Sequence, residues 1–536
     1  MTQTEEGRAV RRKLRELFGI DFRSLVVFRI GLGLMLLFDL VKRSLTLRAH
    51  YTESGLFPGE VALRTTEPTI FQAFLLSDGL LVQSLLFVFM GVLASCFVLG
   101  YRTRPVIVLY LMLLASLDRR NYWVLHTGDV FLFVLALWAC FLPLGARFSL
   151  DRLRNPRPAT ESMQHVSVGS VALLLQIAVF YFAAGVLKLH HEVWTHGDAM
   201  WVFARIEEYT RPFGTLLGRF ETLAMVLTYF TLVLECGGPF LLFSPLLTQK
   251  IRTVLVFVFM SFHLGIQLAV YIGVFELLSI VAVSVFLPAW FWDAVLPRVR
   301  VPAPVRRSWR VWGARLRGWV PERPPRQVPS WTRTAIRGLG IGWQMLGAGC
   351  LVVVLVANYG SLTGRKVQAM ENSGYARQLG LLQNWSIFSD IEPLSRGWFL
   401  VIGQQEDGHF VDVLNDTSFD GRLKRPERFA ETFPNHNMRR FWVQMSKQSN
   451  SWLRPFLADY LCRTWNSSHA ARLVNLLIVH IGKAGRDETE VMQPLINFHH
   501  PEYQARRRGV EYQVEDTPKN RALRADWERL LDQFRR

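Results

Sequence analysis

Apolar runs of about twenty residues recur along the chain, and this feature constrains the fold most strongly. A run of that length crosses the hydrocarbon core of a bilayer as a helix. Half of the 536 residues are hydrophobic, which exceeds the need of one soluble core. We predict an all-α polytopic membrane bundle of about nine spans, at residues 24–41, 79–100, 106–117, 130–144, 166–187, 223–243, 254–270, 273–291 and 341–356.

The charge distribution predicts the orientation of these spans. The net charge of +18 could indicate a nucleic-acid partner, but the basic residues gather in the short segments between spans. With the N-terminus inside the cell, every such segment falls on the cytoplasmic side, as the positive-inside rule requires. We therefore expect a multi-pass protein of the cell membrane, embedded in the lipid bilayer, with no nucleic-acid partner. The basic segments are 8–15, 102–104, 147–157, 250–252 and 298–333.

The chain divides into three predicted parts. Residues 1–23 form a cytoplasmic N-terminal segment, and residues 24–357 form the membrane domain with a cytoplasmic Arg/Pro-rich loop at 294–334. Residues 358–536 are predicted to form a small extracytoplasmic α+β domain. Two apolar runs flank Asp407-Gly408, which is a hairpin signal. Residues 471–483 predict a further strand, and a charged helical tail follows Pro501.

The most informative stretch is QIAVFYFAAGVLKLHHEVWTHGDAM at residues 176–200. It places Lys188 at the mouth of a predicted span. Burial disfavours the charged form of an amine, so a buried Lys188 would be able to accept a proton. The alternative is that Lys188 extends to the lipid headgroups, as lysines near span ends commonly do.

Small and aromatic residues share the helical face of Lys188. Tyr181, Ala184 and Gly185 lie seven, four and three residues before it, which leaves a slot for a flat ligand. The same pattern also suits a close helix–helix contact. On the span at 254–270, His263 and Gln267 share one face, either as part of a site or as partners for a neighbouring helix.

Two further groups of polar residues are candidates for chemistry. His126 with Asp129 could form a proton relay or simply a loop hydrogen bond. His190, His191, Glu192 and His196 match no standard zinc spacing, so we expect no metal site. The five cysteines include no CxxC pair, and we expect no disulfide framework.

Three segments together resemble a known family. They are LVVFRIGLGLMLLFDL at 25–40, YFAAGVLKL followed by Trp194 and Gly197, and FHLGIQLAVYIGVF at 262–275. These segments resemble the vitamin K-dependent gamma-glutamyl carboxylase and its bacterial relatives, which share a horizontally transferred transmembrane domain, abbreviated HTTM. The resemblance covers about residues 20–295.

The resemblance implies a carbon–carbon lyase coupled to quinol epoxidation. Lys188 would be the base that deprotonates reduced vitamin K or a menaquinol-type quinone. The quinol anion would react with dioxygen, and the oxygenated product would remove a proton from a glutamyl side chain of an exported peptide, which then captures carbon dioxide. The residues given catalytic roles are Lys188, His126 and His263, and those expected to bind the quinone are Tyr181, Ala184, Gly185, Trp194 and Gln267.

The chain also departs from that family. The carboxylase's external disulfide has no counterpart, and Ile387, Phe388 and Ser389 stand where the carboxylase has a histidine. The quinol half of the chemistry is therefore better supported than carboxylation. The alternatives are a quinol oxygenase, an epoxidase or a peptide-maturation enzyme that adds no carbon dioxide, and a non-enzymatic membrane scaffold or transporter. Transporters tend to have two matching halves with broken helices, a symmetry that this sequence lacks.

Overall fold

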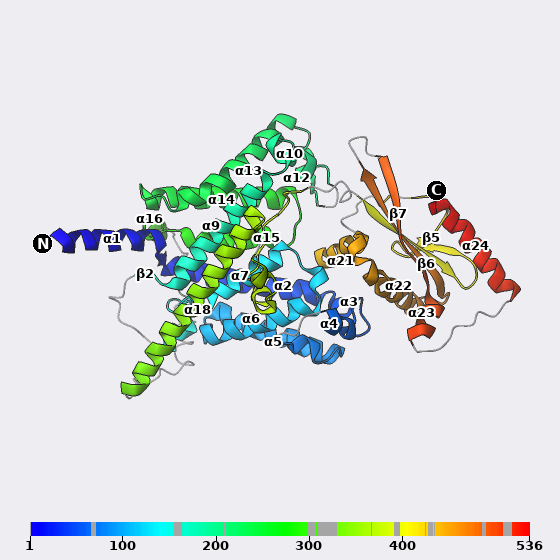
Figure 1. Ribbon diagram of the computed structural model, residues 1–536, viewed down its shortest axis with the longest axis horizontal. Coiled ribbons are helices and arrows are strands. Elements are labelled where there is room, and N and C mark those ends of the chain that lie inside the picture. Colours follow the sequence, from blue (N-terminus) through cyan, green and yellow to red (C-terminus); the bar gives the residue numbers. More distant parts are fainter. Residues whose placement is uncertain are drawn as a thin grey trace.

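The structure, a computed structural model, contains a helical bundle and a separate β-sheet that lie at opposite ends of its long axis (Figure 1). The residues described are 2–65, 71–154, 163–206, 209–298, 307, 330–365, 367–390, 397–423, 425–426, 432–433, 435–484, 489–507 and 517–535.

A helix occupies each of the nine predicted span positions. Among the described residues, six helices are long and apolar enough to cross a membrane, or seven if a pair bent by 98° counts as one span. The protein is therefore a multi-pass membrane protein, but the count of nine spans is not confirmed. The six are α2 (Phe22–Ser44), α5 (Leu80–Leu99), α9 (Val168–Lys188), α13 (Glu221–Leu242), α14 (Thr248–Ala269) and α18 (Ser330–Thr363).

Three predicted positions fall short of a straight span. The bent pair consists of α15 (Phe275–Val283), with its 3-10 extension to Phe286, and α16 (Ala289–Val295) with the turn that follows it. Helix α6 (Thr103–Arg120) ends in charged residues. Helix α7 (Thr127–Ala139) has 13 residues, about 20 Å of helix, and nearly all of them are buried. Because its neighbours surround it, α7 contributes core rather than a lipid-facing surface.

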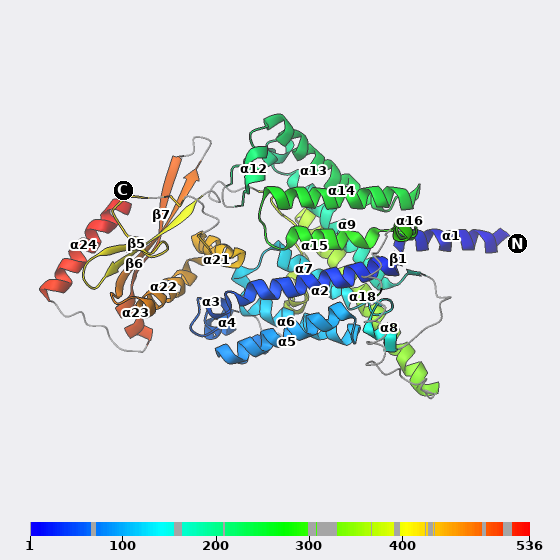
Figure 2. The same ribbon diagram turned by 180° about the vertical axis from the view of Figure 1, so that it is seen from behind.

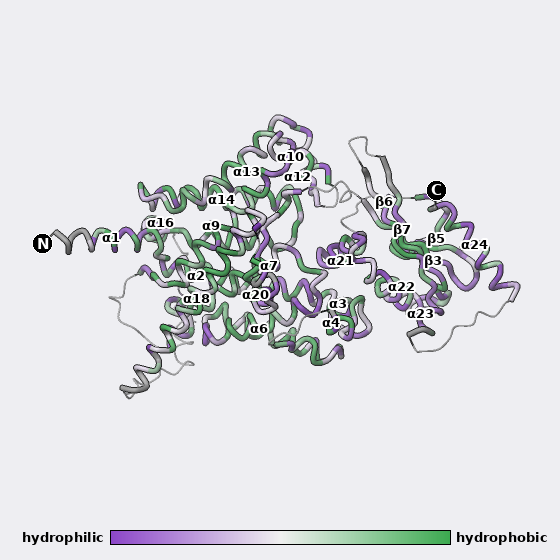
Figure 3. Tube along the Cα trace, in the orientation of Figure 1, coloured by the Kyte–Doolittle hydropathy of each residue, from purple (hydrophilic) through white to green (hydrophobic). Residues whose placement is uncertain are grey.

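Lipid-facing and buried surfaces follow the packing of the bundle. Helix α9 packs between α13 and α18, and α2 packs on α5. Large apolar side chains of α5, α13, α14 and α18 remain exposed on the outside of the bundle. Exposed apolar surface on this scale is expected where lipid, and not water, is the solvent. Figure 3 shows the hydrophobic residues concentrated along these helices and in the centre of the sheet.

The C-terminal region contains a five-stranded antiparallel sheet in the order β5-β4-β3-β6-β7. The predicted hairpin at Asp407-Gly408 is confirmed, with Gly408 at φ +94°. The strand predicted at 471–483 is also confirmed as β6. Its long partner β7 was not predicted. The strands are β3 (Trp398–Gln405), β4 (Phe410–Asp412), β5 (Thr417–Ser418), β6 (Leu473–Ala484) and β7 (Thr489–His499).

Helix α21 (His436–Ser446) joins the two parts of the molecule. Figures 1 and 2 show it between the sheet and one end of the bundle, which we call the sheet-facing end. Its N-cap Asn435 donates to the carbonyl of Lys42, at the end of α2. The remaining C-terminal helices are α22 (Arg454–Ser468), α23 (His500–Arg507) and α24 (Pro518–Arg535), so the predicted helical tail is present.

The predicted loop at 294–334 is helical at both ends, because α16 and the following turn reach Arg298 and α18 begins at Ser330. Its residues 299–306 and 308–329 lie outside the described part of the chain. After α18, the chain returns to the bundle, where Trp385 packs in the same core as α7 and α9. The shorter elements are α1 (Thr2–Phe18), β1 (Ile20–Asp21), α3 (Leu47–Tyr51), α4 (Gly59–Thr65), α8 (Leu150–Arg154), β2 (Gln164–His165), α19 (Gln368–Glu371) and α20 (Gly374–Gln378).

Candidate functional site

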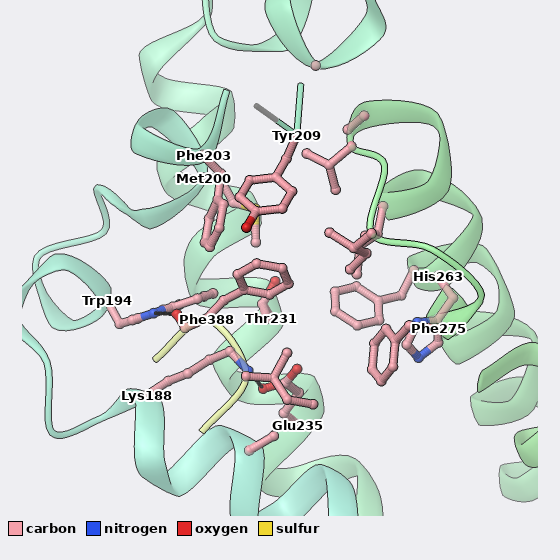
Figure 4. Close-up of a pocket in the computed structure, with 18 of the residues that line it drawn as sticks. Lys188, Trp194, Met200, Phe203, Tyr209, Thr231, Glu235, His263, Phe275 and Phe388 are labelled. Carbon is pink, nitrogen blue, oxygen red and sulfur yellow. Dashed lines mark hydrogen bonds and ion pairs between the residues drawn. The ribbon is translucent and has the colours of Figure 1, made fainter. Parts of the chain in front are cut away.

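A largely apolar cavity opens among the sheet-facing ends of α9, α13 and α14. It contains about 840 Å³ of space that no protein atom occupies, part of which is open to the surroundings. Most of its lining is aromatic or aliphatic. Figure 4 shows Lys188 and Glu235 at one end and His263 with Phe275 at another side.

Lys188 and Glu235 form a buried ion pair in this cavity. The Lys188 Nζ donates to Glu235 Oε2 at 2.7 Å, and the two side chains are only 5% and 8% exposed. Lys188 is the last residue of α9, and Glu235 lies in the middle of α13. The amine therefore points into the bundle, and it does not extend to the headgroups as the alternative interpretation required.

Gly185 sets the distance between the two helices that carry this pair. A Cβ at this position would lie 2.8 Å from Cys236 Sγ and 3.0 Å from Glu235 Cβ. Only glycine permits so close an approach of α9 to α13. Gly185 thus faces α13 and does not line the cavity, whereas Ala184 does.

Trp194 covers the Lys188 amine. The Lys188 Nζ lies 5.2 Å from the centroid of the indole ring, within the range of a cation–π contact. The indole Nε1 donates to the Phe388 carbonyl at 2.8 Å, which fixes the ring in place. Trp194 lies in the short helix α10 (Glu192–Thr195), and Gly197, at φ +90°, turns the chain back toward α11 (Ala199–Phe203).

A second polar pair lines the cavity at a different level. The Tyr181 hydroxyl and His263 Nε2 are 2.7 Å apart. Tyr181 precedes Lys188 by seven residues, about 10 Å along α9, and Ala184 lies between them. His263 is 1% exposed, and its Nδ1 has no hydrogen-bond partner among the described residues. A polar ligand group would satisfy that nitrogen.

Besides Gly185, two predicted site residues lie outside the cavity. Gln267 does not line it; its backbone carbonyl accepts from Arg211. His126 caps α7, with its ring Nδ1 accepting from the Gly128 N–H at 2.9 Å and its own N–H donating to Asp129. Burial lowers the pKa of His126 to about 4. The His126–Asp129 interaction is therefore, first of all, a helix cap.

Glu235 is the functional residue whose role sequence reasoning missed. Glu235 does not pair with Arg29, a buried charge in another apolar span, because Arg29 donates to the carbonyls of Leu144, Arg147 and Phe148. The available signal was an acidic residue in the interior of an apolar span, which by default indicates function.

The segment after α18 completes the cavity. Ile387 and Phe388 line it, and a buried amide network holds the segment against the bundle. Gln176 Nε2 donates to Gln383 Oε1 at 2.8 Å, and Trp385 Nε1 donates to the same oxygen. In the sequence, this covering segment lies far from the apolar runs whose helices frame the cavity.

No group of three or more His, Cys, Asp or Glu that could hold a metal is present in the described ranges.

A family model described as HTTM domain matches residues 19–290, about half of the chain. Neither a curated protein nor a solved structure matches the chain. The matched region contains Lys188, Glu235, Tyr181 and His263, but not the covering segment.

Proposed function

The chain belongs to the HTTM domain family, and on that premise we propose that it is a vitamin K-dependent gamma-carboxylase-like membrane enzyme with Lys188 as the base. Its co-substrates would be a reduced quinone, of the vitamin K or menaquinol type, with dioxygen and carbon dioxide. The single observation that carries this proposal is a buried amine, hydrogen-bonded to a buried carboxylate, at the end of an apolar cavity.

The Lys188–Glu235 pair provides a way to make the amine a base. Moving one proton across the 2.7 Å hydrogen bond converts two buried charges into a neutral amine and a neutral acid. In an apolar site this transfer removes charge separation that low dielectric makes costly. Glu235 then holds the proton, and Lys188 can accept one from a ligand hydroxyl.

The side chains that line the cavity suit a flat aromatic alcohol. Phe203, Phe388 and Phe275 supply ring faces and edges, while Lys188 and His263 provide polar contacts at separate places. A bound hydroquinone would supply the reaction with dioxygen, and through it the strength of base needed to deprotonate a glutamyl side chain. The tail of such a ligand would extend toward lipid.

Besides providing the base, this chain would exclude water from the reaction. Trp194 covers the amine and Phe388 lines the cavity next to it, so apolar side chains would separate a strongly basic species at this end of the cavity from bulk solvent. A base of that strength in contact with water would be protonated before it reached an acceptor.

We propose the orientation that the basic segments predict. The N-terminus and the loop at 294–334 would be cytoplasmic, and the sheet-facing end and the C-terminal domain extracytoplasmic. Helices α6 and α7 would complete a membrane-embedded set of nine. The quinone would enter from the bilayer and an exported peptide from outside.

The test is product analysis with purified full-length protein in lipid nanodiscs, supplied with reduced vitamin K, dioxygen, a glutamate-containing peptide and labelled bicarbonate. Vitamin K epoxide together with labelled peptide supports the full carboxylase. Epoxide without label supports the oxygenase alternative, which the absence of the family's histidine near Trp385 favours. No oxidation of vitamin K or of a menaquinol would overturn both and leave a scaffold or transporter.

A further inference from the structure

A second pocket lies between the end of α6 and the neighbouring helix α20, which Figure 3 shows beside it. It contains about 1340 Å³ of space that no protein atom occupies, part of which is open to the surroundings. Its lining comes from α6, the 3-10 turn Tyr122–Val124, α7 and residues 377–382, and we call it the α6–α20 pocket. It shares no lining residue with the cavity around Lys188, so it is a separate site.

Two arginines line the α6–α20 pocket from different elements. Arg119 is in the last turn of α6, and Arg377 is in α20. Arg119 Nη2 donates to the Gly374 carbonyl at 3.4 Å, a contact between α6 and the start of α20. A guanidinium has five N–H donors in a planar fork, so it can keep a backbone contact and also bind a phosphate oxygen.

The other polar groups of the lining favour an anionic ligand. The carboxylate of Asp118 already accepts from the buried Arg43 Nη1 at 2.7 Å. Gln378 is only 9% exposed, and its side-chain amide has no hydrogen-bond partner among the described residues. Because buried amides are normally hydrogen-bonded, the Gln378 NH₂ is a donor that a ligand oxygen would satisfy.

The rest of the lining is apolar and continues into the surface that faces lipid. Ala115, Val130 and Phe133 are part of it. Along α6, Met112, Ala115 and Arg119 follow one another at spacings of three and four residues, which places them on one helical face. Met112 is 40% exposed. An apolar chain that extends from the pocket along this face would therefore remain in contact with the bilayer.

Two aromatic residues place the pocket near the edge of the bilayer. Tyr122 and Trp123 both line it, and Tyr122 is 66% exposed. The Trp123 ring packs edge to face on Trp452 of the C-terminal region, with ring centroids 6.0 Å apart. The pocket thus lies at the sheet-facing end of the bundle. Tyr and Trp are enriched at the level where the hydrocarbon of a membrane meets water.

The polar and apolar parts together select an amphiphile. Arginine pairs with phosphate oxygens through two parallel N–H donors. A soluble phosphate would leave the apolar lining unfilled, and an uncharged lipid would leave the guanidinium groups and the Gln378 amide without an acceptor. We propose that the α6–α20 pocket binds the phosphodiester headgroup of a membrane phospholipid, with an acyl chain along α6. This binding does not depend on the quinol chemistry proposed above.

The test is native mass spectrometry of the full-length protein, purified in detergent and stripped of lipid. It is then given equal concentrations of phosphatidylglycerol and of diacylglycerol with the same acyl chains. Phosphatidylglycerol should be retained at least about tenfold more, whereas equal retention would overturn the proposal. A parallel sample receives glycerol 3-phosphate as well. Displacement of phosphatidylglycerol at comparable concentration would identify a soluble phosphate as the ligand and overturn the lipid assignment.

Variants assign the bound lipid to this pocket. Arg119→Gln with Arg377→Gln should lower retention of phosphatidylglycerol at least about tenfold, since each change removes a charged hydrogen-bond partner. Arg48→Gln with Arg64→Gln is the matched control, because these exposed arginines of α3 and α4 do not line the pocket. It should retain the lipid as wild type does. Wild-type retention in a folded Arg119→Gln, Arg377→Gln protein would overturn the assignment.

Ala115→Leu provides an independent variant if loss of both arginines unfolds the protein. The larger side chain fills apolar space in the pocket without altering its charge. It should lower retention of phosphatidylglycerol several-fold at an unchanged unfolding temperature. Wild-type retention in this variant would show that the acyl chain lies elsewhere and would overturn the proposal.

Discussion

Replacing Gly185 with alanine should move Glu235 away from Lys188, the proposed base. The new Cβ would lie 3.0 Å from Glu235 Cβ, 2.8 Å from Cys236 Sγ and 3.1 Å from the Cys236 backbone N. Carbon atoms pack at about 3.5–4.0 Å, so α13 must move away from α9 by roughly 0.5–1 Å. A cysteine rotamer change cannot relieve the contacts with the backbone N and Glu235 Cβ.

This displacement acts on both stability and rate. Overpacking of this kind costs about 1–3 kcal/mol. It also lengthens the 2.7 Å Lys188–Glu235 hydrogen bond beyond about 3.2 Å, the limit of a good one. A misplacement of about 1 Å can reduce a rate by about 100-fold. We therefore expect the turnover of reduced vitamin K to fall by one to two orders of magnitude.

The assay is vitamin K epoxide formation in nanodiscs, combined with thermal unfolding of the same preparation. Gly237→Ala is the control, because it adds a Cβ to α13, the helix that Gly185→Ala displaces, and a Cβ at Gly237 meets nothing within 4 Å. It should leave both measurements unchanged. A Gly185→Ala protein with wild-type turnover and stability would refute the reasoning that close approach of α9 and α13 positions Glu235.

Three further predictions concern individual side chains. Lys188→Met should destabilise the protein by about 3–5 kcal/mol, because it leaves Glu235 buried without its partner, and adding Glu235→Gln should recover much of that loss in thermal unfolding. Tyr181→Phe removes the only hydrogen bond of the His263 ring among the described residues and should cost about 1–3 kcal/mol by the same measurement; no change would mean that the hydroxyl and ring are satisfied otherwise. His126 has a pKa lowered from 6.5 to about 4 by burial, so the unfolded chain binds its proton first as pH falls. The contribution of the neutral His126 to the free energy of unfolding is complete above pH 6.5 and declines by about 1.4 kcal/mol per pH unit down to pH 4. A pH series of unfolding temperatures should lose this decline in the His126→Asn variant.

Much of the membrane part could be predicted because local signals determine it. Apolar runs gave a helix at every expected position, and helical spacing placed Tyr181, Ala184 and Lys188 along one cavity. The turn chemistry of Asp407-Gly408 gave the hairpin. Each of these features depends on residues close together in the chain, where periodicity and turn preferences act directly.

The remaining features depend on contacts between distant segments. Glu235 lies 47 residues from Lys188, and only the packing of α9 on α13 brings them together. The same packing explains why Gly185 faces a helix and not the cavity. Helix α7 has the composition of a span, but it is short and surrounded by neighbours, which apolarity alone could not reveal.

The cover of the cavity was also beyond sequence reasoning. Phe388 reaches the site only because the chain returns to the bundle after α18, and a hydrogen bond spanning 207 residues, between Gln176 and Gln383, holds it there. No periodic pattern encodes such a return. Strand β7 was missed because its charged and polar residues obscure the alternation that a half-buried strand usually has.

Quinol-dependent oxygen uptake tests the central claim most directly. Purified wild-type protein, Lys188→Met and Lys250→Met would be compared at saturating reduced vitamin K. Lys250 serves as a control because it is an exposed lysine near the start of α14, whereas the other end of α14 lines the cavity. The account predicts wild-type uptake by Lys250→Met and a fall of at least about 100-fold for Lys188→Met, the scale of a lost general base. Full uptake by a folded Lys188→Met protein would contradict the assignment of that amine as the base.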